Sequence, residues 1–297
     1  MKLKGVYPIV PTPFDETGRI CRASIEALAE FLVQKGVDGV AVLGVMGEGQ
    51  KLDELEKKQV IELFRQALPA NIQLVAGVRA AGTELARRAA AEAVYLGADA
   101  ILLGPPPVQS DEAIFSYCKQ VASTINVPII LHDYPAATNI LLSVELTSRM
   151  FREIEKVQYL KLEDPPTGPK MDKLRRLIGE DLAVFSALGG MYIFEELDRG
   201  AVGIMTGFAY PELLVKIYQL YCQGDIDQAM TVFYDILPLI RFEFQPGLGI
   251  SLRKHILNRR GIFRSTALRH PGLEADAKTL EHLDRILHHL KKRGYDL

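Results

Sequence analysis

The sequence predicts a closed (β/α)8 barrel, in which eight parallel strands alternate with helices, followed by a C-terminal helical extension. Short β-rich runs and amphipathic helical stretches alternate eight times along the first three quarters of the chain. Several β-rich runs are almost continuously apolar, as expected for strands buried on both faces. The count of eight favours a barrel over an open doubly wound sheet, and no G-x-G-x-x-G motif follows the first strand.

The elements follow one another in a regular order. Strands are expected near residues 6–11, 39–45, 73–78, 100–104, 128–134, 157–163, 182–187 and 201–206. Beyond the eighth strand we expect only helices, near residues 212–223, 225–240, 247–259 and 277–292. We therefore divide the chain into a barrel, residues 1–223, and a C-terminal helical region, residues 224–297, with no flexible linker between them.

Composition excludes several classes of protein. The chain has 297 residues and a formal net charge of −2, which gives no electrostatic basis for binding nucleic acid or an anionic membrane. Charged residues interrupt every apolar run before it reaches the length of a membrane span, and the N-terminus has no signal-peptide pattern. The three cysteines lie far apart, without metal spacing, so we expect reduced thiols and a cytoplasmic protein.

Lys161 is the most informative candidate residue, because it lies within an otherwise apolar run that predicts the sixth strand. A lysine on an inward-facing strand position is either neutralised by a partner or used chemically. One interpretation is an ammonium that reaches the strand end and pairs with Glu163 or Asp164. The other is a desolvated lysine with a lowered pKa, whose free amine attacks a ketone to form a Schiff base.

The ends of the other strands carry possible helpers, since the active site of such a barrel lies at the C-terminal ends of its strands. Alternation places Glu163 on the same face as Lys161, and His132 and Tyr134 on the inward face of the fifth strand, where they are candidates for proton transfer. We place substrate-binding residues at three further strand ends, namely Gly44, Val45 and Met46, then Gly189, then Met205. No cluster has convincing metal-ligand spacing, and we expect no metal and no cofactor.

The chain resembles the dihydrodipicolinate synthase / N-acetylneuraminate lyase family of class I aldolases. The resemblance covers most of the chain and rests on several short motifs: Pro8-x-x-Pro11-Thr12-Pro13-Phe14, Gly44-x-x-Gly47-Glu48, Leu96-Gly97-Ala98-Asp99-Ala100, Lys161 and Gly200-Ala201-x-Gly203. It implies a (β/α)8 barrel, a homotetramer built as a dimer of dimers, and a Schiff base between Lys161 and a 2-oxo acid such as pyruvate.

Several positions depart from the family pattern. Val45 and Met46 stand where the family usually has threonine or serine, so only backbone donors remain there for a carboxylate. His132 replaces the tyrosine of the fifth strand, and Ala137 replaces the arginine that binds the second substrate in the synthases. A second family tyrosine is replaced within Pro105-Pro106-Pro107. We therefore do not expect a true dihydrodipicolinate synthase.

Three hypotheses follow for the function. The first is a lyase, either a dehydratase or an aldolase, that forms a Schiff base with a 2-oxo acid such as a 2-keto-3-deoxy sugar acid. The second is a paralogue that binds a 2-oxo acid without turnover, since Val45, Met46, Pro107 and Ala137 replace usual polar or aromatic groups by ones with little acid–base capacity. The third is a dihydrodipicolinate synthase with a non-standard proton relay.

Overall fold

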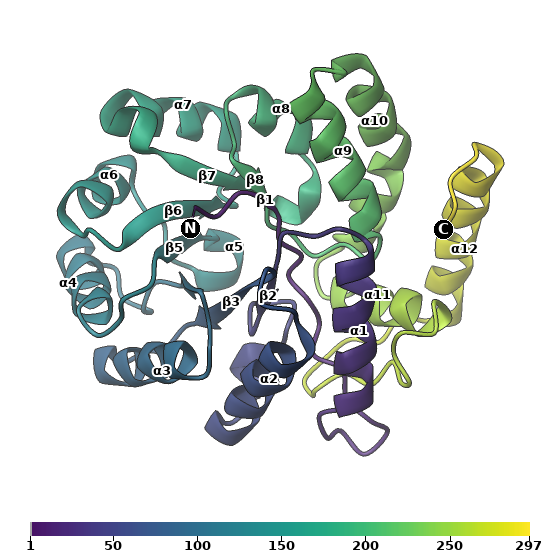
Figure 1. Ribbon diagram of the computed structural model, residues 1–297, viewed down its shortest axis with the longest axis horizontal. Coiled ribbons are helices and arrows are strands. Elements are labelled where there is room, and N and C mark those ends of the chain that lie inside the picture. The colour runs from purple at the N-terminus through teal and green to yellow at the C-terminus, as the bar shows by residue number, and fades with distance from the viewer. Residues whose placement is uncertain (1) are drawn as a thin grey trace.

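The computed structural model describes residues 2–297 and confirms the predicted barrel (Figure 1). Its strands are β1 Gly5–Val6, β2 Gly39–Val42, β3 Gln73–Val78, β4 Ala100–Leu103, β5 Ile129–Asp133, β6 Val157–Leu162, β7 Ala183–Ser186 and β8 Gly203–Ile204. They form one parallel sheet in the order β1-β8-β7-β6-β5-β4-β3-β2. A parallel bridge between Ile9 and Ala41 joins the two ends of this order, which closes the ring.

Helices surround the strands, and Figure 1 shows α1 to α4 and α6 to α9 arranged around the outside of the sheet, with the short α5 beside β5. They are α1 Arg22–Gln34, α2 Glu54–Ala67, α3 Thr83–Tyr95, α4 Asp111–Ala122, α5 Pro135–Thr138, α6 Val144–Glu153, α7 Thr167–Ile178, α8 Ile193–Asp198, α9 Pro211–Gln223, α10 Ile226–Glu243, α11 Gly249–Arg259 and α12 Ala277–Lys292. Short 3-10 turns lie at Gly49–Lys51, Gly179–Asp181 and Leu188–Gly190. As predicted, the described chain beyond β8 is helical and contains no further strand.

The first strand is shorter than the predicted 6–11, for a chemical reason. Pro8, Pro11 and Pro13 have no backbone N–H to donate, so a regular ladder cannot continue past β1. The segment nevertheless stays beside β8, because the N–H of Tyr7 donates to Ile204 O at 2.8 Å and that of Ile9 donates to Thr206 O at 3.0 Å. The prolines therefore interrupt the regular strand but leave the barrel wall in place.

Two apolar cores follow from the alternation of side chains along the strands. The larger lies between the strands and the helices, and it includes Leu160 and Leu162 of β6. The smaller fills the barrel interior and includes Tyr159 of β6 together with Phe185 of β7. Since Tyr159 faces inward and its neighbours face the helices, Lys161 also has the inward parity that the sequence predicts.

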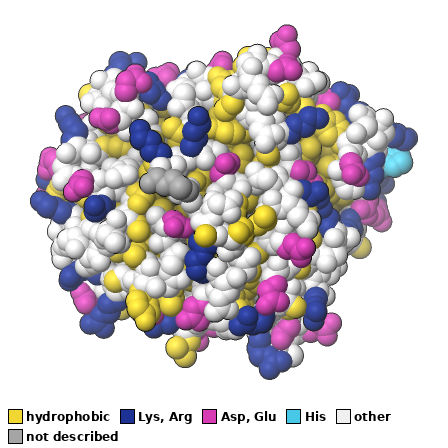
Figure 2. Space-filling model, in the orientation of Figure 1, with side chains coloured by type: hydrophobic (Ala, Val, Ile, Leu, Met, Phe, Trp, Pro, Cys, Tyr) yellow, Lys and Arg dark blue, Asp and Glu magenta, His cyan; other side chains and the backbone are white. Residues whose placement is uncertain are grey.

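The surface matches the near-neutral composition. Figure 2 shows basic and acidic side chains interspersed over the viewed face, without a large region of one sign. Within residues 2–297, no helix combines the length and the apolar character needed to span a membrane.

Candidate active site

Lys161 lies at the C-terminal end of β6, directly across the ladder from His132 on β5. Only 4% of Lys161 is exposed, so its ammonium does not extend along the strand end into solvent. Apolar strand residues on both sides force this placement, because moving the lysine outward would shift every neighbouring side chain to the wrong face. The alternation of side chains along β6 therefore buries the Lys161 amine at the barrel mouth.

Three polar groups meet at this buried amine. Lys161 Nζ contacts Glu163 Oε2 and lies 3.1 Å from His132 Nε2. The same Glu163 oxygen lies 2.8 Å from His132 Nε2, which completes a triangle of hydrogen-bonding atoms. His132 Nε2 can accept a proton from Lys161 or donate one to Glu163, but it cannot do both at once. The triangle therefore links the protonation of the amine to that of the imidazole.

Burial and charge act in opposite directions within the triangle. Burial lowers the pKa of Lys161, and the negative charge of Glu163 opposes that shift. Burial also lowers the pKa of His132, and the nearby Lys161 charge lowers it further. For Glu163, burial favours the neutral acid, but the Lys161 charge and the His132 hydrogen bond outweigh it and lower the pKa to about 2. Glu163 therefore stays ionised, and proton transfer within the triangle takes place between Lys161 and His132.

Asp133 and Asp164 lie outside this triangle. Lys170 on α7 pairs with both carboxylates, at 2.7 Å from Asp133 Oδ2 and 2.8 Å from Asp164 Oδ2. Of the two partners that the ion-pair interpretation offers for Lys161, the structure therefore brings Glu163 to the lysine and not Asp164. Asp133 points away from His132, as the alternation along β5 predicts.

A cavity of about 50 Å³ lies above Lys161. Eight of the nine predicted catalytic and substrate-binding residues line it, namely Gly44, Val45, Met46, His132, Tyr134, Lys161, Glu163 and Gly189. Met205 does not, because it is fully buried in the inner core below the cavity. The Tyr134 ring lies above the amine, with its centroid 5.9 Å from Lys161 Nζ, and burial raises the pKa of its phenol.

The turn after β2 lines the cavity and has unused backbone donors. The N–H groups of Val45 and Met46 make no hydrogen bond to any residue in the described range 2–297. Leu43 and Glu48, which flank the turn, both adopt left-handed backbone angles, with φ of 60° and 53°. Such conformations are costly for residues with a side chain and persist only where the surrounding structure holds them.

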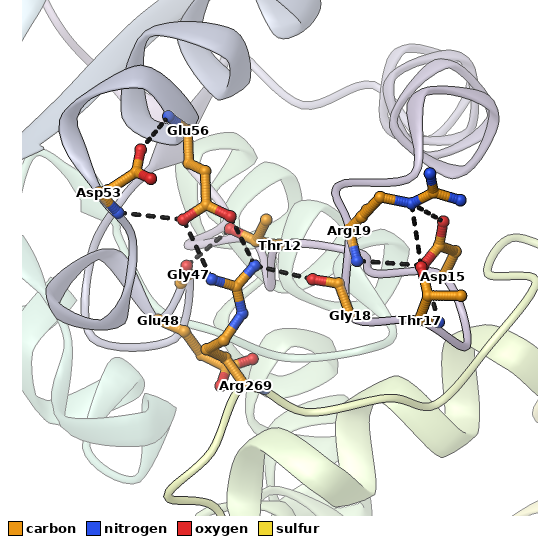
Figure 3. Close-up of polar contacts among 10 residues, drawn as sticks. All are labelled: Thr12, Asp15, Thr17, Gly18, Arg19, Gly47, Glu48, Asp53, Glu56 and Arg269. Carbon is orange, nitrogen blue, oxygen red and sulfur yellow. Dashed lines mark hydrogen bonds and ion pairs between the residues drawn. The ribbon is translucent and has the colours of Figure 1, made fainter.

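The C-terminal region supplies that support through Glu48. The Glu48 carboxylate is buried and accepts hydrogen bonds from Lys254 Nζ at 2.7 Å, Lys51 Nζ at 3.0 Å and the backbone N–H of Arg269 at 3.0 Å. Arg269 in turn forms a two-pronged ion pair with Glu56 at the start of α2 (Figure 3). A turn that follows the second strand is therefore held in place by residues more than 200 positions away in the sequence.

Sequence reasoning missed six of the lining residues: Ile9, Leu102, Thr206, Gly207, Phe244 and Arg253. Phe244 and Arg253 are the most informative of these, because they come from the C-terminal helical region and not from strand ends. Gly189 marks the contact with Phe244, since a Cβ at Gly189 would lie 2.2 Å from that ring. No local sequence pattern reports this long-range packing.

The described residues contain no group of three or more His, Cys, Asp or Glu side chains arranged to hold a metal ion. The polar side chains that line the cavity supply one amine, one imidazole, one carboxylate, one phenol, one aliphatic hydroxyl and one guanidinium.

Comparison with known proteins identifies the family. The model of the dihydrodipicolinate synthetase family matches residues 2–290, which covers the barrel and most of the C-terminal region. The chain belongs to this family. Its members are lyases, and the match confirms the resemblance that the sequence motifs indicate.

Individual relatives span nearly the whole chain. L-2-keto-3-deoxyarabonate dehydratase of Azospirillum brasilense is 28% identical over 97% of this chain and 94% of its own length. The 4-hydroxy-tetrahydrodipicolinate synthase of Methanosphaerula palustris is 29% identical over 96% of this chain and 98% of its own. The crystal structure of dihydrodipicolinate synthase from Rhodopseudomonas palustris aligns with a TM-score of 0.91 and 35% identity, covering 97% of each chain.

Proposed function

We propose that this family member is a Schiff-base-forming lyase that acts on a 2-oxo acid, and that its substrate is a 2-keto-3-deoxy sugar acid. The observation that carries the proposal is the buried Lys161 amine, whose pKa burial lowers and which contacts both His132 and Glu163. A buried amine beside a proton acceptor is the arrangement that amine nucleophiles require. The similarity to a keto-deoxy acid dehydratase supports the choice of substrate class.

The chemistry begins when the Lys161 ammonium gives a proton to His132 and the free amine attacks the C2 ketone. His132 returns this proton to the carbinolamine hydroxyl, and loss of that hydroxyl as water leaves an iminium at C2, which withdraws electrons and makes the C3 hydrogens acidic. A base removes a C3 proton, and the C4 hydroxyl takes a proton and leaves as water. Hydrolysis of the iminium then restores Lys161, so the net reaction is the loss of one water from the substrate.

We propose that His132 is the base that removes the C3 proton, because its lowered pKa leaves the imidazole neutral and its Nε2 lies 3.1 Å from Lys161 Nζ. Glu163 stays ionised and stabilises the positive iminium that replaces the ammonium. Tyr134 stands above the amine and is the candidate donor of the proton to the leaving hydroxyl, since burial keeps its phenol protonated.

The same residues can also support carbon–carbon cleavage. If the base removes the C4 hydroxyl proton instead, the C3–C4 bond breaks and an aldehyde leaves. The cavity above Lys161 is too small for a whole sugar acid. A second cavity of about 440 Å³ shares Gly44, Val45, Leu102 and His132 with it, and this space offers room for the carbons beyond C4.

A substrate screen tests the proposal. The wild type and Lys161→Ala are incubated with a panel of 2-keto-3-deoxy sugar acids and other 2-oxo acids, and the products are identified by mass. We expect loss of one water from a sugar acid with the wild type and no product with Lys161→Ala. Release of pyruvate together with an aldehyde would show that the protein is an aldolase and not a dehydratase. Binding of 2-oxo acids without turnover of any of them would favour the binding paralogue instead.

A true dihydrodipicolinate synthase is the weaker alternative, because position 137 is alanine where the synthases have an arginine for the second substrate. Several relatives are nevertheless named 4-hydroxy-tetrahydrodipicolinate synthase. Adding pyruvate and aspartate semialdehyde to the same screen tests it directly, and we expect no condensation product. The homotetramer remains a prediction, which light scattering on the purified protein would test.

A further inference from the structure

Arg253 is a buried cation at the cavity that the proposed chemistry does not use. It lies on α11, only 2% of it is exposed, and it lines the same cavity as Lys161. Gly249 leaves room for the guanidinium, and Gly207 leaves room for the Met46 side chain beside it. A Cβ at Gly249 would lie 2.9 Å from Arg253 Nη1, and a Cβ at Gly207 would lie 3.6 Å from Arg253 Nε and 2.8 Å from Met46 Cγ. The local backbone therefore provides the space that the guanidinium occupies.

The hydrogen-bonding capacity of Arg253 is largely unused. Its Nε lies 3.1 Å from Glu243 Oε2, and its Nη1 lies 3.2 Å from the thioether sulfur of Met46, which is a weak acceptor. Within the described residues, the guanidinium makes no other polar contact within hydrogen-bond distance. A guanidinium has five N–H donors, and burying them without acceptors is costly. An anion in the cavity would supply the missing acceptors.

Glu243 does not fully compensate the charge. Burial raises the pKa of Glu243 to about 7, even though Arg253 acts to lower it. Glu243 Oε2 also accepts the backbone N–H of Ala209 at 3.1 Å, and Oε1 has no partner among the described residues. Near neutral pH part of the Glu243 population is thus neutral, and the guanidinium keeps net positive charge beside the cavity.

Met46 shows which end of the substrate this charge would meet. It belongs to the turn after β2, whose N–H groups at Val45 and Met46 make no hydrogen bond within the described residues and are therefore available to a carboxylate. Neither side chain has a hydroxyl to help hold that carboxylate. The flexible thioether of Met46 now occupies the position next to Arg253 Nη1, and an unbranched side chain of this kind is readily displaced.

We propose that Arg253 binds the C1 carboxylate of the 2-oxo acid, together with the backbone N–H groups of Val45 and Met46. The substrate carboxylate displaces the Met46 thioether from Nη1 and forms a charge-assisted pair with the guanidinium. This inference rests on the proposed function for the identity of the ligand. It makes Arg253 the residue that selects 2-oxo acids over neutral ketones, and it assigns the C-terminal region a direct part in substrate recognition.

The test compares pyruvate with its neutral amide, pyruvamide, by calorimetry. Both ligands are titrated into Lys161→Ala, in which no imine can form, and into the double variants that add Arg253→Met or the control Arg259→Met. Arg259 lies on the same helix, but it pairs with Asp284 at the surface. We expect Arg253→Met to weaken pyruvate binding at least about tenfold and pyruvamide binding by less than about threefold. The control should change neither.

Three outcomes would overturn the inference: equal losses for both ligands, an unchanged affinity for pyruvate, or no preference of the Lys161→Ala parent for pyruvate over its amide. If Arg253→Met does not fold, Arg253→Lys keeps the charge but loses the planar guanidinium with its five donors, and we expect pyruvate to bind it about tenfold more weakly.

Borohydride trapping of the wild type separates this inference from the proposed function. Trapping at Lys161 combined with a pyruvate affinity that does not depend on Arg253 contradicts only the role of Arg253. No trapping, combined with an affinity that does depend on Arg253, contradicts only the Schiff base.

Discussion

Replacing Glu163 by glutamine should move the pH range in which Lys161 forms an imine. Glu163 Oε2 contacts Lys161 Nζ and keeps the amine protonated against the effect of burial. Two unit charges about 3 Å apart attract by about 5 kcal/mol at an effective dielectric constant of about 20. The glutamine oxygen can still accept a hydrogen bond, so we expect the ammonium form to lose at least about 3 kcal/mol, which corresponds to a shift of about two pH units.

The assay is the rate of borohydride trapping with pyruvate, measured across pH by intact mass. Since only the free amine attacks the ketone, the midpoint of the profile reports the proton affinity of Lys161. In Glu163→Gln this midpoint should fall by about two pH units, while turnover of the true substrate drops because the iminium loses its counter-charge. Asp164→Asn is the matched control, since Asp164 pairs with Lys170 and not with Lys161. A midpoint that stays in place or rises in Glu163→Gln would refute the reasoning.

Three further predictions concern other residues. His132→Asn should leave trapping at Lys161 measurable but reduce turnover at least about a hundredfold, the loss expected for a general base, as steady-state kinetics would show. Glu48→Gln should destabilise the fold by about 3 kcal/mol, since it leaves the buried Lys254 ammonium without its counter-charge, and chemical denaturation would measure this. Burial raises the pKa of Glu196 to about 7, so its contribution to stability is present below the ordinary pKa near 4.5 and is lost as pH rises through 7. Glu196→Gln should remove that loss and stabilise the protein at pH 8 by about 2–3 kcal/mol relative to wild type. If the free energy of unfolding of Glu196→Gln changes between pH 5 and pH 8 as much as that of the wild type does, the prediction is wrong.

The sequence predicts the fold and the floor of the site because both depend on local patterns. Alternation along a strand places Lys161 on the inward face with His132 beside it, since parallel strands in a barrel end at the same rim. The first strand is the main local difference, and its prolines explain it. Family membership confirms the resemblance that the motifs carry.

The upper part of the site cannot be predicted in the same way. Arg253 and Phe244 reach the cavity because the C-terminal helices pack across the barrel mouth, and that packing depends on contacts such as Lys254 with Glu48, which no local periodicity encodes. Met205 illustrates the opposite case. Its place at a strand end suggests a lining residue, but its side chain lies one layer too deep, in the inner core.

The most direct test of the account is borohydride reduction of the wild-type protein in the presence of pyruvate or a 2-keto-3-deoxy sugar acid, followed by peptide mapping. The account predicts one covalent adduct, located on Lys161 and absent from Lys161→Ala. An unmodified Lys161 peptide across a broad panel of 2-oxo acids, or an adduct on another lysine, would contradict it.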